Sequence, residues 1–99
     1  MSNMPDEALL KQIRVFRETI DRLDEEIVQK LNERARAAME IGHIKRRAGW
    51  PVYVPTREEE VIAHVIKANQ GPLSDAAIQR LFERIIDESR RQERESTKE

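Results

Sequence analysis

Three cations and one acid lie on a helix face that should otherwise be apolar. Steps of three and four residues along positions 17–45 stay on one side of a helix. A buried cation on such a face is unfavourable unless an anion pairs with it. The pattern therefore favours a pocket that binds an anion, although these side chains could instead reach the surface or pair with acids. The apolar members of the face are Ile20, Ile27, Leu31, Ala38 and Ile41, and its charged members are Arg17, Asp24, Arg34 and Lys45.

Two further pairs of polar residues are suitably spaced to bind a ligand. Arg57 and Glu58 open a predicted second helix, where free backbone amides and the positive end of the helix dipole favour an anion. Ser89 and Glu93 lie one turn apart where the apolar face of a third helix should continue. Ordinary capping with a surface arginine would also explain the first pair, and a solvated helix end would explain the second. Periodicity leaves both interpretations open.

The sequence lacks the usual sets of nucleophiles and metal ligands. His43 and His64 have no companion at metal-ligand spacing, and we interpret both as surface or packing residues. A zinc or di-iron site would need Glu-x-x-His pairs facing a core, and no glycine-rich phosphate loop or Ser-His-Asp set is present. What remains is positive charge and hydrogen bonding. These suit the binding of a polyanion, or catalysis of a reaction that needs no nucleophile.

Residues 7–48 form one long predicted helix that carries most of the charged groups. The stretch contains no proline and a single glycine, and strong helix formers dominate it. Asp6 is suited to cap its start, and Gly49-Trp50-Pro51 should end it. At about 1.5 Å per residue the helix would span roughly 60 Å, whereas a compact domain of this size is only about 35 Å across. A second copy of the chain is the simplest cover for its apolar side, so we predict a homodimer whose long helices cross.

Two shorter helices should follow an extended loop. Thr56 and Glu59 have the spacing of a capping box, which predicts a second helix from Thr56 to about Asn69. Gly71-Pro72 should stop it, and Ser74-Asp75 should cap a third helix. The expected fold class is all-α, with one very long helix and two shorter ones. The predicted apolar faces comprise Val61, Ile62, Val65 and Ile66 on the second helix, and Ile78, Leu81, Phe82, Ile85 and Ile86 on the third.

Length and composition limit the class of protein. The chain has 99 residues, which suits a single domain, and we expect positions 1–5 and 94–99 to be flexible. Charged residues make up 37% of the chain but the formal net charge is -1, whereas a nucleic-acid-binding domain usually has a basic excess. There is no cysteine, no signal-peptide pattern and no apolar run long enough to span a membrane. We therefore expect a cytoplasmic protein that binds neither nucleic acid nor membranes.

Six ordered segments of the chain resemble the all-helical chorismate mutases. The similarity covers roughly residues 9–93 and rests on the order and spacing of the segments rather than on one motif. It implies an intertwined helical homodimer with two active sites, which rearranges chorismate to prephenate in phenylalanine and tyrosine biosynthesis without cofactor or metal. The matching segments are residues 16–24, 31–34, 41–45, 51–58, 69–73 and 81–89.

Carried over by position, the resemblance implies a role for each candidate residue. Arg34 would hold one substrate carboxylate within its own subunit, while Arg17 would reach the second carboxylate from the other subunit. Lys45 and Glu93 would share the ether oxygen of the breaking bond, and Glu58 would accept a hydrogen bond from the substrate hydroxyl. The remaining members would support substrate binding: Arg57 beside Glu58, Ser89 near a carboxylate, and Val54 through its backbone.

Two of these positions depart from some members of the family. Some members have glutamine where this chain has Glu93, although a glutamate also resembles members of the family. An ionised carboxylate cannot donate a hydrogen bond, so Glu93 must be protonated to act on the ether oxygen, and burial should raise its pKa. Other members carry an acidic residue where this chain has Val54, which leaves only backbone contacts at that position.

Two alternative functions fit the same pattern. An isochorismate–pyruvate lyase on this scaffold would use similar arginines and the same lysine, but the glutamates at positions 58 and 93 resemble the mutases more closely. A helical dimer without activity, which binds or regulates another enzyme, would also carry a charged helix face. The lyase differs in its products, salicylate and pyruvate. The inactive dimer predicts that Arg34→Ala leaves function intact.

Overall fold

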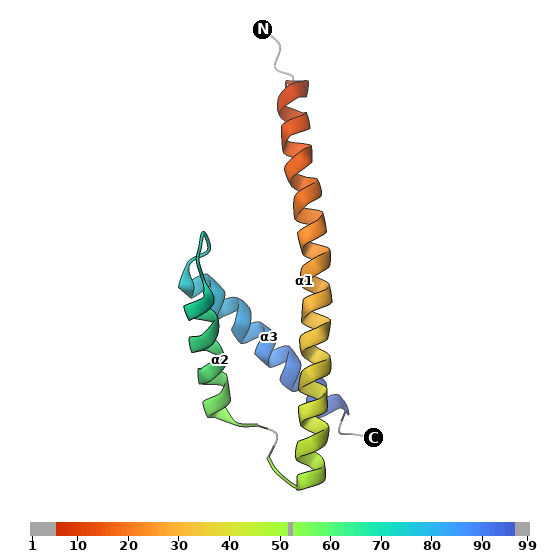
Figure 1. The fold of residues 1–99 in the computed structure, drawn as a ribbon, viewed down its shortest axis with the longest axis vertical. Helices are drawn as coiled ribbons and strands as arrows, with labels where there is room; N and C mark the ends of the chain where they lie inside the picture. Colours follow the sequence, from red (N-terminus) through yellow and green to blue (C-terminus); the bar gives the residue numbers. More distant parts are fainter. Residues whose placement is uncertain (1–5, 52, 97–99) are drawn as a thin grey trace. The chain divides into compact units, whose positions relative to one another are not determined.

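Three α-helices and no strand make up the part of the chain that the structure describes, residues 6–51 and 53–96 of a computed structural model (Figure 1). The helices are α1 (Glu7–Ala48), α2 (Pro55–Ala68) and α3 (Asp75–Ser96). The all-α fold class is confirmed, and α1 has the predicted bounds at both ends. The chain divides into two compact units, residues 1–34 and 35–99, and the division falls within α1. Each unit is described by itself.

The two ends of α1 are capped as the residues predict. At the start, Oδ1 of Asp6 accepts a hydrogen bond from the backbone N–H of Ala8 at 2.8 Å, which satisfies one of the free amides of the first turn. At the end, the N–H of Gly49 donates to the carbonyl of Arg46 at 3.2 Å, and the N–H of Trp50 donates to the carbonyl of Lys45 at 2.8 Å. This is a Schellman motif, and Gly49 has the positive φ of 72° that it requires.

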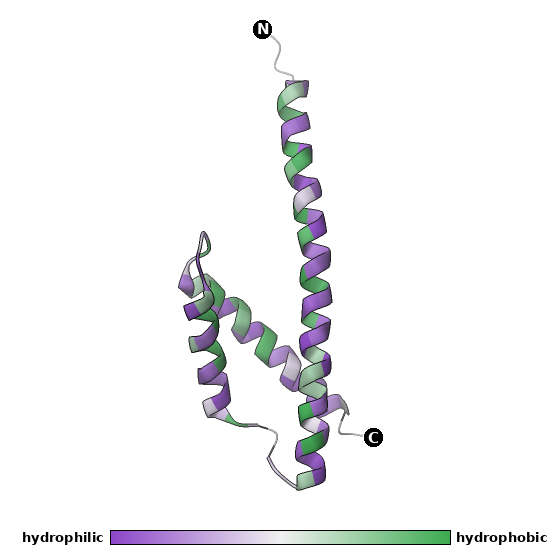
Figure 2. Ribbon diagram, in the orientation of Figure 1, coloured by the Kyte–Doolittle hydropathy of each residue, from purple (hydrophilic) through white to green (hydrophobic). Residues whose placement is uncertain are grey.

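In the N-terminal unit the apolar side chains of α1 are exposed in the single chain. Phe16 is 69% exposed and Ile20 is 54% exposed. Figure 2 shows hydrophobic and hydrophilic bands alternating along this helix. Isolated apolar residues on a surface are ordinary, whereas a continuous set indicates a covered interface. The exposed set in this unit comprises Leu9, Leu10, Ile13, Val15, Phe16, Ile20, Leu23, Ile27, Val28 and Leu31.

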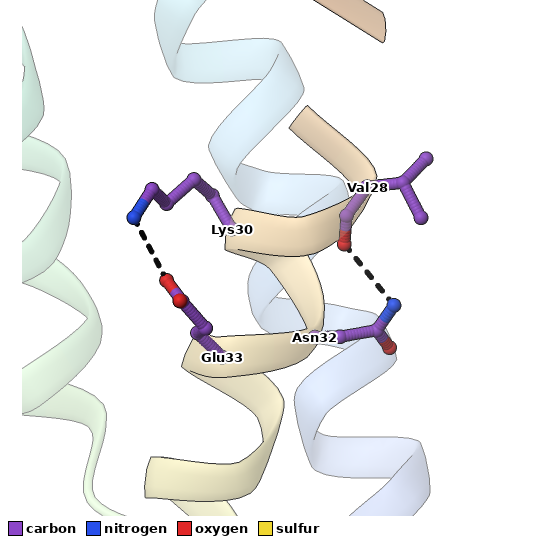
Figure 3. Close-up of polar contacts among 4 residues, drawn as sticks. All are labelled: Val28, Lys30, Asn32 and Glu33. Carbon is purple, nitrogen blue, oxygen red and sulfur yellow. Dashed lines mark hydrogen bonds and ion pairs between the residues drawn. The ribbon is translucent and has the colours of Figure 1, made fainter. Parts of the chain in front are cut away.

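Polar side chains of the same unit satisfy one another within the helix. Nζ of Lys30 donates to Oε2 of Glu33 at 3.0 Å, and Nδ2 of Asn32 donates to the backbone carbonyl of Val28 at 3.1 Å (Figure 3). Exposed pairs of this kind contribute only about 0.2–0.5 kcal/mol each to a helix. The unit therefore gains little from polar contacts, and its stability depends on covering its apolar side chains.

The predicted capping box at the start of the second helix is wrong. The helix α2 begins at Pro55, with Val54 as its N-cap residue in an extended conformation and without a side-chain cap. Proline favours the first helical position, since its φ is preset and its missing N–H would be unpaired there in any case. This preference moves the start ahead of Thr56, which lies inside the first turn.

Side chains organise the turn between α2 and α3. Nδ2 of Asn69 donates to the carbonyl of Leu73 at 2.8 Å and to Oδ1 of Asp75 at 2.9 Å, and Oδ1 of Asn69 accepts from the N–H of Gly71 at 3.1 Å. Oγ of Ser74 accepts from the N–H of Ala77 at 3.1 Å, so the predicted cap of the third helix is confirmed. The turn fixes the direction in which α3 leaves α2.

The helices α2 and α3 pack against each other through half-buried side chains. Every predicted apolar residue of α2 and most of those of α3 are half-buried, whereas Leu81 is 53% exposed in the single chain. No hydrophobic residue that the structure describes is fully buried. Full burial of such a side chain stabilises a fold by about 1.5–3 kcal/mol, so this thin core contributes less per residue. The half-buried members are Val61, Ile62, Val65, Ile66, Ile78, Phe82, Ile85 and Ile86.

The last helix ends in a polar segment. The helix continues to Ser96, while positions 1–5, 52 and 97–99 lie outside the described residues, together with the flexibility expected at the two termini. Among the described residues, no helix is long and apolar enough to cross a membrane.

Candidate functional site

Within the C-terminal unit, the second half of α3 lies against the last turns of α1. Gly42 is buried, and a Cβ atom at this position would lie 3.8 Å from Cγ of Glu93. One turn earlier, Nε2 of Gln92 donates to Sδ of Met39 at 3.3 Å. The side chain of Glu93 therefore lies against α1 at Gly42, where a Cβ atom would make only an ordinary van der Waals contact with it. This contact brings Glu93 close to Lys45, the last of the cations predicted to line a pocket.

The environment of Glu93 favours its protonated form. Burial is the largest influence and raises the pKa of the Glu93 carboxyl above its ordinary value, while the positive charges of Lys45 and Arg90 oppose the rise. Removal from water disfavours the charged carboxylate more than the two cations stabilise it. The direction agrees with the expectation from sequence. The carboxyl of Glu93 therefore stays neutral to higher pH than that of an exposed glutamate, and in the neutral form it can donate a hydrogen bond.

Arg90 connects three segments around this contact, and the sequence analysis did not single it out. Nη2 of Arg90 on α3 pairs with Oε1 of Glu58 in the first turn of α2. Its guanidinium carbon lies 4.5 Å from the ring centroid of Tyr53, in the segment before α2. Nη2 also lies 3.9 Å from Oδ1 of Asp87. The sequence could have indicated this residue, because Arg90 lies four residues after Ile86 and continues the apolar face of α3, as Ser89 does.

The other predicted residues of this unit lie around the same contact or away from it. Ser89 is half-buried on α3, one turn before Glu93. Arg57 does not join the group that contains Glu58, since its Nη1 lies 3.3 Å from Oε2 of Glu60 and its side chain is largely exposed. Val54 is the N-cap residue of α2, a position that leaves backbone groups near a helix start free to bind.

The two remaining predicted residues belong to the N-terminal unit. Arg17 is exposed and Arg34 is half-buried on α1. The structure thus brings together Lys45, Glu93 and, through Arg90, Glu58, all within residues 35–99.

A separate cavity of about 490 Å³, open to solvent, lies on the last turns of α1. Its lining residues include none of the predicted site residues, although Nδ1 of His43 lies 3.7 Å from Oε1 of Glu40 within it. No cluster of three metal-ligating side chains occurs among the residues that the structure describes. The contact between α1 and α3, which contains predicted site residues, is the candidate site. The cavity is lined by Glu40, His43, Arg46 and Arg47.

Taken together, the groups at this contact suit the stabilisation of developing negative charge. Lys45 supplies a fixed cation, and Glu93 supplies a hydrogen-bond donor in its neutral form. Glu58 supplies an acceptor whose orientation is held by Arg90. A substrate that carries negative charge and a hydroxyl would find a partner for each. No nucleophile is needed for such chemistry.

Comparison with protein families identifies a match over most of the chain. The family model described as chorismate mutase type II matches residues 16–94. The chain is similar to the bifunctional chorismate mutase/prephenate dehydratase of Aquifex aeolicus, with 37% identity over 81 residues. It is also similar to the protein of the same name from Stutzerimonas stutzeri, with 40% identity over 81 residues. These alignments cover 78% and 76% of this chain, but the chain spans only 22% of the length of either relative.

A solved structure has a similar fold over nearly its whole length. The chorismate mutase (form II) from Thermus thermophilus aligns with a TM-score of 0.81 and 38% sequence identity. The alignment covers 84% of this chain and 94% of that one. The family match over residues 16–94 includes both Lys45 and Glu93.

Proposed function

Because the chain belongs to the chorismate mutase type II family, we propose that it catalyses the rearrangement of chorismate to prephenate. The observation that best supports this proposal is the contact of α1 with α3, where a cation and a carboxyl of raised pKa meet. The product would enter phenylalanine and tyrosine biosynthesis, in the cytoplasm.

The reaction is unimolecular, so the protein acts by selecting a conformation and by stabilising charge. Chorismate is a flexible dianion that reacts when it folds into a chair-like shape, and Arg17 and Arg34 hold its two carboxylates in that shape. As the C–O bond breaks and the new C–C bond forms, negative charge develops on the ether oxygen. Lys45 and protonated Glu93 donate to that oxygen, and both interactions strengthen in the transition state. Glu58 accepts from the substrate hydroxyl.

We further propose that two copies of the chain form each active site. Ten large apolar side chains between Leu9 and Leu31 are exposed in the single chain, and a second α1 of the same sequence offers a complementary surface. In such a dimer Arg17 enters the site from the other subunit. The substrate dianion then compensates the cations on the otherwise apolar face.

The direct test is conversion of chorismate by the purified protein. We expect prephenate to form, and we expect Arg34→Ala to abolish most of the activity while the helical content measured by circular dichroism stays unchanged. Incubation with isochorismate serves as the control for the alternative lyase function. Salicylate and pyruvate as the main products would contradict the mutase assignment. Full activity of the Arg34→Ala protein would contradict the role of this arginine.

The proposed role of Glu93 predicts a characteristic pH dependence. Only the protonated carboxyl donates to the ether oxygen, so turnover should be highest below its pKa and should decline as the pH rises through it. Burial raises that pKa, which moves the decline toward higher pH than for an exposed glutamate. Glutamine donates at every pH, so Glu93→Gln should flatten the profile. Measurement of kcat from pH 4 to 9 for both proteins tests this, and a pH-independent wild type would remove the role.

A further inference from the structure

Arg90 connects α3 to two other segments of the C-terminal unit. It pairs with Glu58 at the start of α2, lies over the ring of Tyr53 in the preceding segment, and approaches Asp87 on its own helix. The side chains of Arg90 and Glu58 are each about 30% exposed. Ion pairs that are largely removed from water are strongly coupled, because a lone charge left behind would be poorly solvated.

The geometry of this pair restricts the carboxylate of Glu58. Nη2 of Arg90 engages Oε1 of Glu58, and a carboxylate has about four acceptor positions on its two oxygens. The pairing therefore holds the group in one orientation and leaves acceptor capacity for another donor. The ring of Tyr53 lies against the guanidinium carbon at 4.5 Å, which fixes the plane of the arginine in turn. The buried Nε of Arg90 has no hydrogen-bond partner in the structure, so the retained contacts must compensate for its desolvation.

We infer that Arg90 is a positioning residue, which aims the carboxylate of Glu58 at the substrate hydroxyl and supplies positive charge beside Glu93. This inference rests on the proposed function, because it assigns Arg90 to the same site. Arg90 acts through two neighbours and need not touch the substrate. An arginine suits both tasks, since its planar fork fixes a carboxylate while its charge does not titrate.

The two tasks of Arg90 can be separated by experiment, because orienting Glu58 depends on the shape of the side chain, whereas the effect on Glu93 depends on its charge. Glu93 is faced by Lys45 from α1 and by Arg90 on α3, and both lower its pKa against the effect of burial. Arg90 is itself faced by Glu58 from α2 and by Asp87. A lysine at position 90 keeps a charge near Glu93 but lacks the planar fork. It should therefore restore the pH profile without restoring the orientation of Glu58.

The test is a double-mutant cycle between Arg90→Met and Glu58→Gln. We expect Arg90→Met to lower kcat/KM by about 10- to 100-fold, since small misplacements of a catalytic group have effects of this size. In the Glu58→Gln background the same change should lower kcat/KM by less than about 2-fold, because the group that it positions is already altered.

Arg90→Lys should return the pH midpoint of turnover to that of the wild type while kcat/KM stays low. The matched control is Arg84→Met, an exposed arginine of the same helix that pairs with Glu88 at 2.7 Å, and it should leave kcat/KM unchanged.

Urea unfolding of the wild type, the two single variants Arg90→Met and Glu58→Gln, and the double variant separates this inference from the proposed function. The positioning role is supported if the effects of Arg90→Met and Glu58→Gln are non-additive both on the free energy of unfolding and on kcat/KM. Coupling in stability with additive effects on kcat/KM would overturn it, since Arg90 would then only hold α2 to α3. Additive effects on stability would also overturn it, because the pair would not exist in the folded protein. A wild type that binds no chorismate and forms no prephenate would refute the proposed function, while the unfolding cycle would still report the pair.

Discussion

Replacement of Lys45 with methionine should lower kcat by about 10²–10³-fold, which is the usual effect of losing one donor to a developing oxyanion. Methionine keeps the length and flexibility of the side chain but removes its charge. Lys45 is half-buried near Glu93 on α3, so water replaces its ammonium group poorly. Because the charge on the ether oxygen develops in the transition state, kcat should decrease much more than the affinity for chorismate. Steady-state kinetics at a pH where Glu93 is protonated measures both.

The control for this substitution is available on the same helix. Lys30→Met removes an exposed lysine that pairs with Glu33 at 3.0 Å on α1, and it should leave kcat unchanged. The helical content of both variants should match that of the wild type. If Lys45→Met lost only affinity and kept its kcat, Lys45 would bind the substrate uniformly and would not stabilise the transition state.

Mixing two inactive variants should regenerate activity, because each proposed site takes Arg17 from one subunit and Lys45 from the other. Arg17→Ala and Lys45→Ala homodimers each lack one group in both sites. A heterodimer has one site with both groups and one site with neither. Random reassembly of equal amounts therefore restores about a quarter of the wild-type sites. The variants are unfolded together in urea and refolded, and prephenate formation is compared with that of each variant alone.

Reassembly must be verified independently of activity. Different affinity tags on the two variants allow the heterodimer to be purified and counted. The matched control mixes Arg17→Ala with the double variant Arg17→Ala/Lys45→Ala, which leaves no complete site in any combination. Purified heterodimers without activity would rule out sites built from two subunits, and a monomeric wild type would refute the dimer itself.

The exposed apolar face of α1 predicts that dimerisation also affects the stability of the folded protein. The side chains of Phe16 and Ile20 are mostly exposed in the single chain, and the core between α2 and α3 consists of half-buried residues. In the proposed dimer, a second copy would cover α1 and add hydrophobic stabilisation that the single chain lacks. We accordingly expect folding and dimerisation to be coupled, so that the urea midpoint increases with protein concentration.

Local sequence signals determined the long helix and its ends. Asp6 and Ser74 cap helices because their side-chain oxygens reach amides two or three residues away. Gly49 ends α1 because only a residue that tolerates positive φ completes the motif. The apolar faces of α2 and α3 follow from helical periodicity alone. Each of these signals acts within about one turn of helix, so a linear sequence contains it in full.

One prediction was wrong because neighbouring sequence signals competed. Thr56 and Glu59 have the spacing of a capping box, but Pro55 begins α2 one residue earlier, since its fixed φ favours the first helical position. Leu81 continues the apolar periodicity of α3, and its side chain is exposed in the single chain.

The tertiary structure alone showed which groups Arg90 joins and how Glu93 packs against α1. Arg90 joins Glu58 across 32 positions of sequence, and Glu93 reaches α1 beside Gly42. Neither contact follows from spacing, because each depends on the angle at which one helix crosses another. The raised pKa of Glu93 has the same origin. A sequence determines which groups can carry charge. Packing removes water from around each group and so determines the free-energy cost of keeping that group charged.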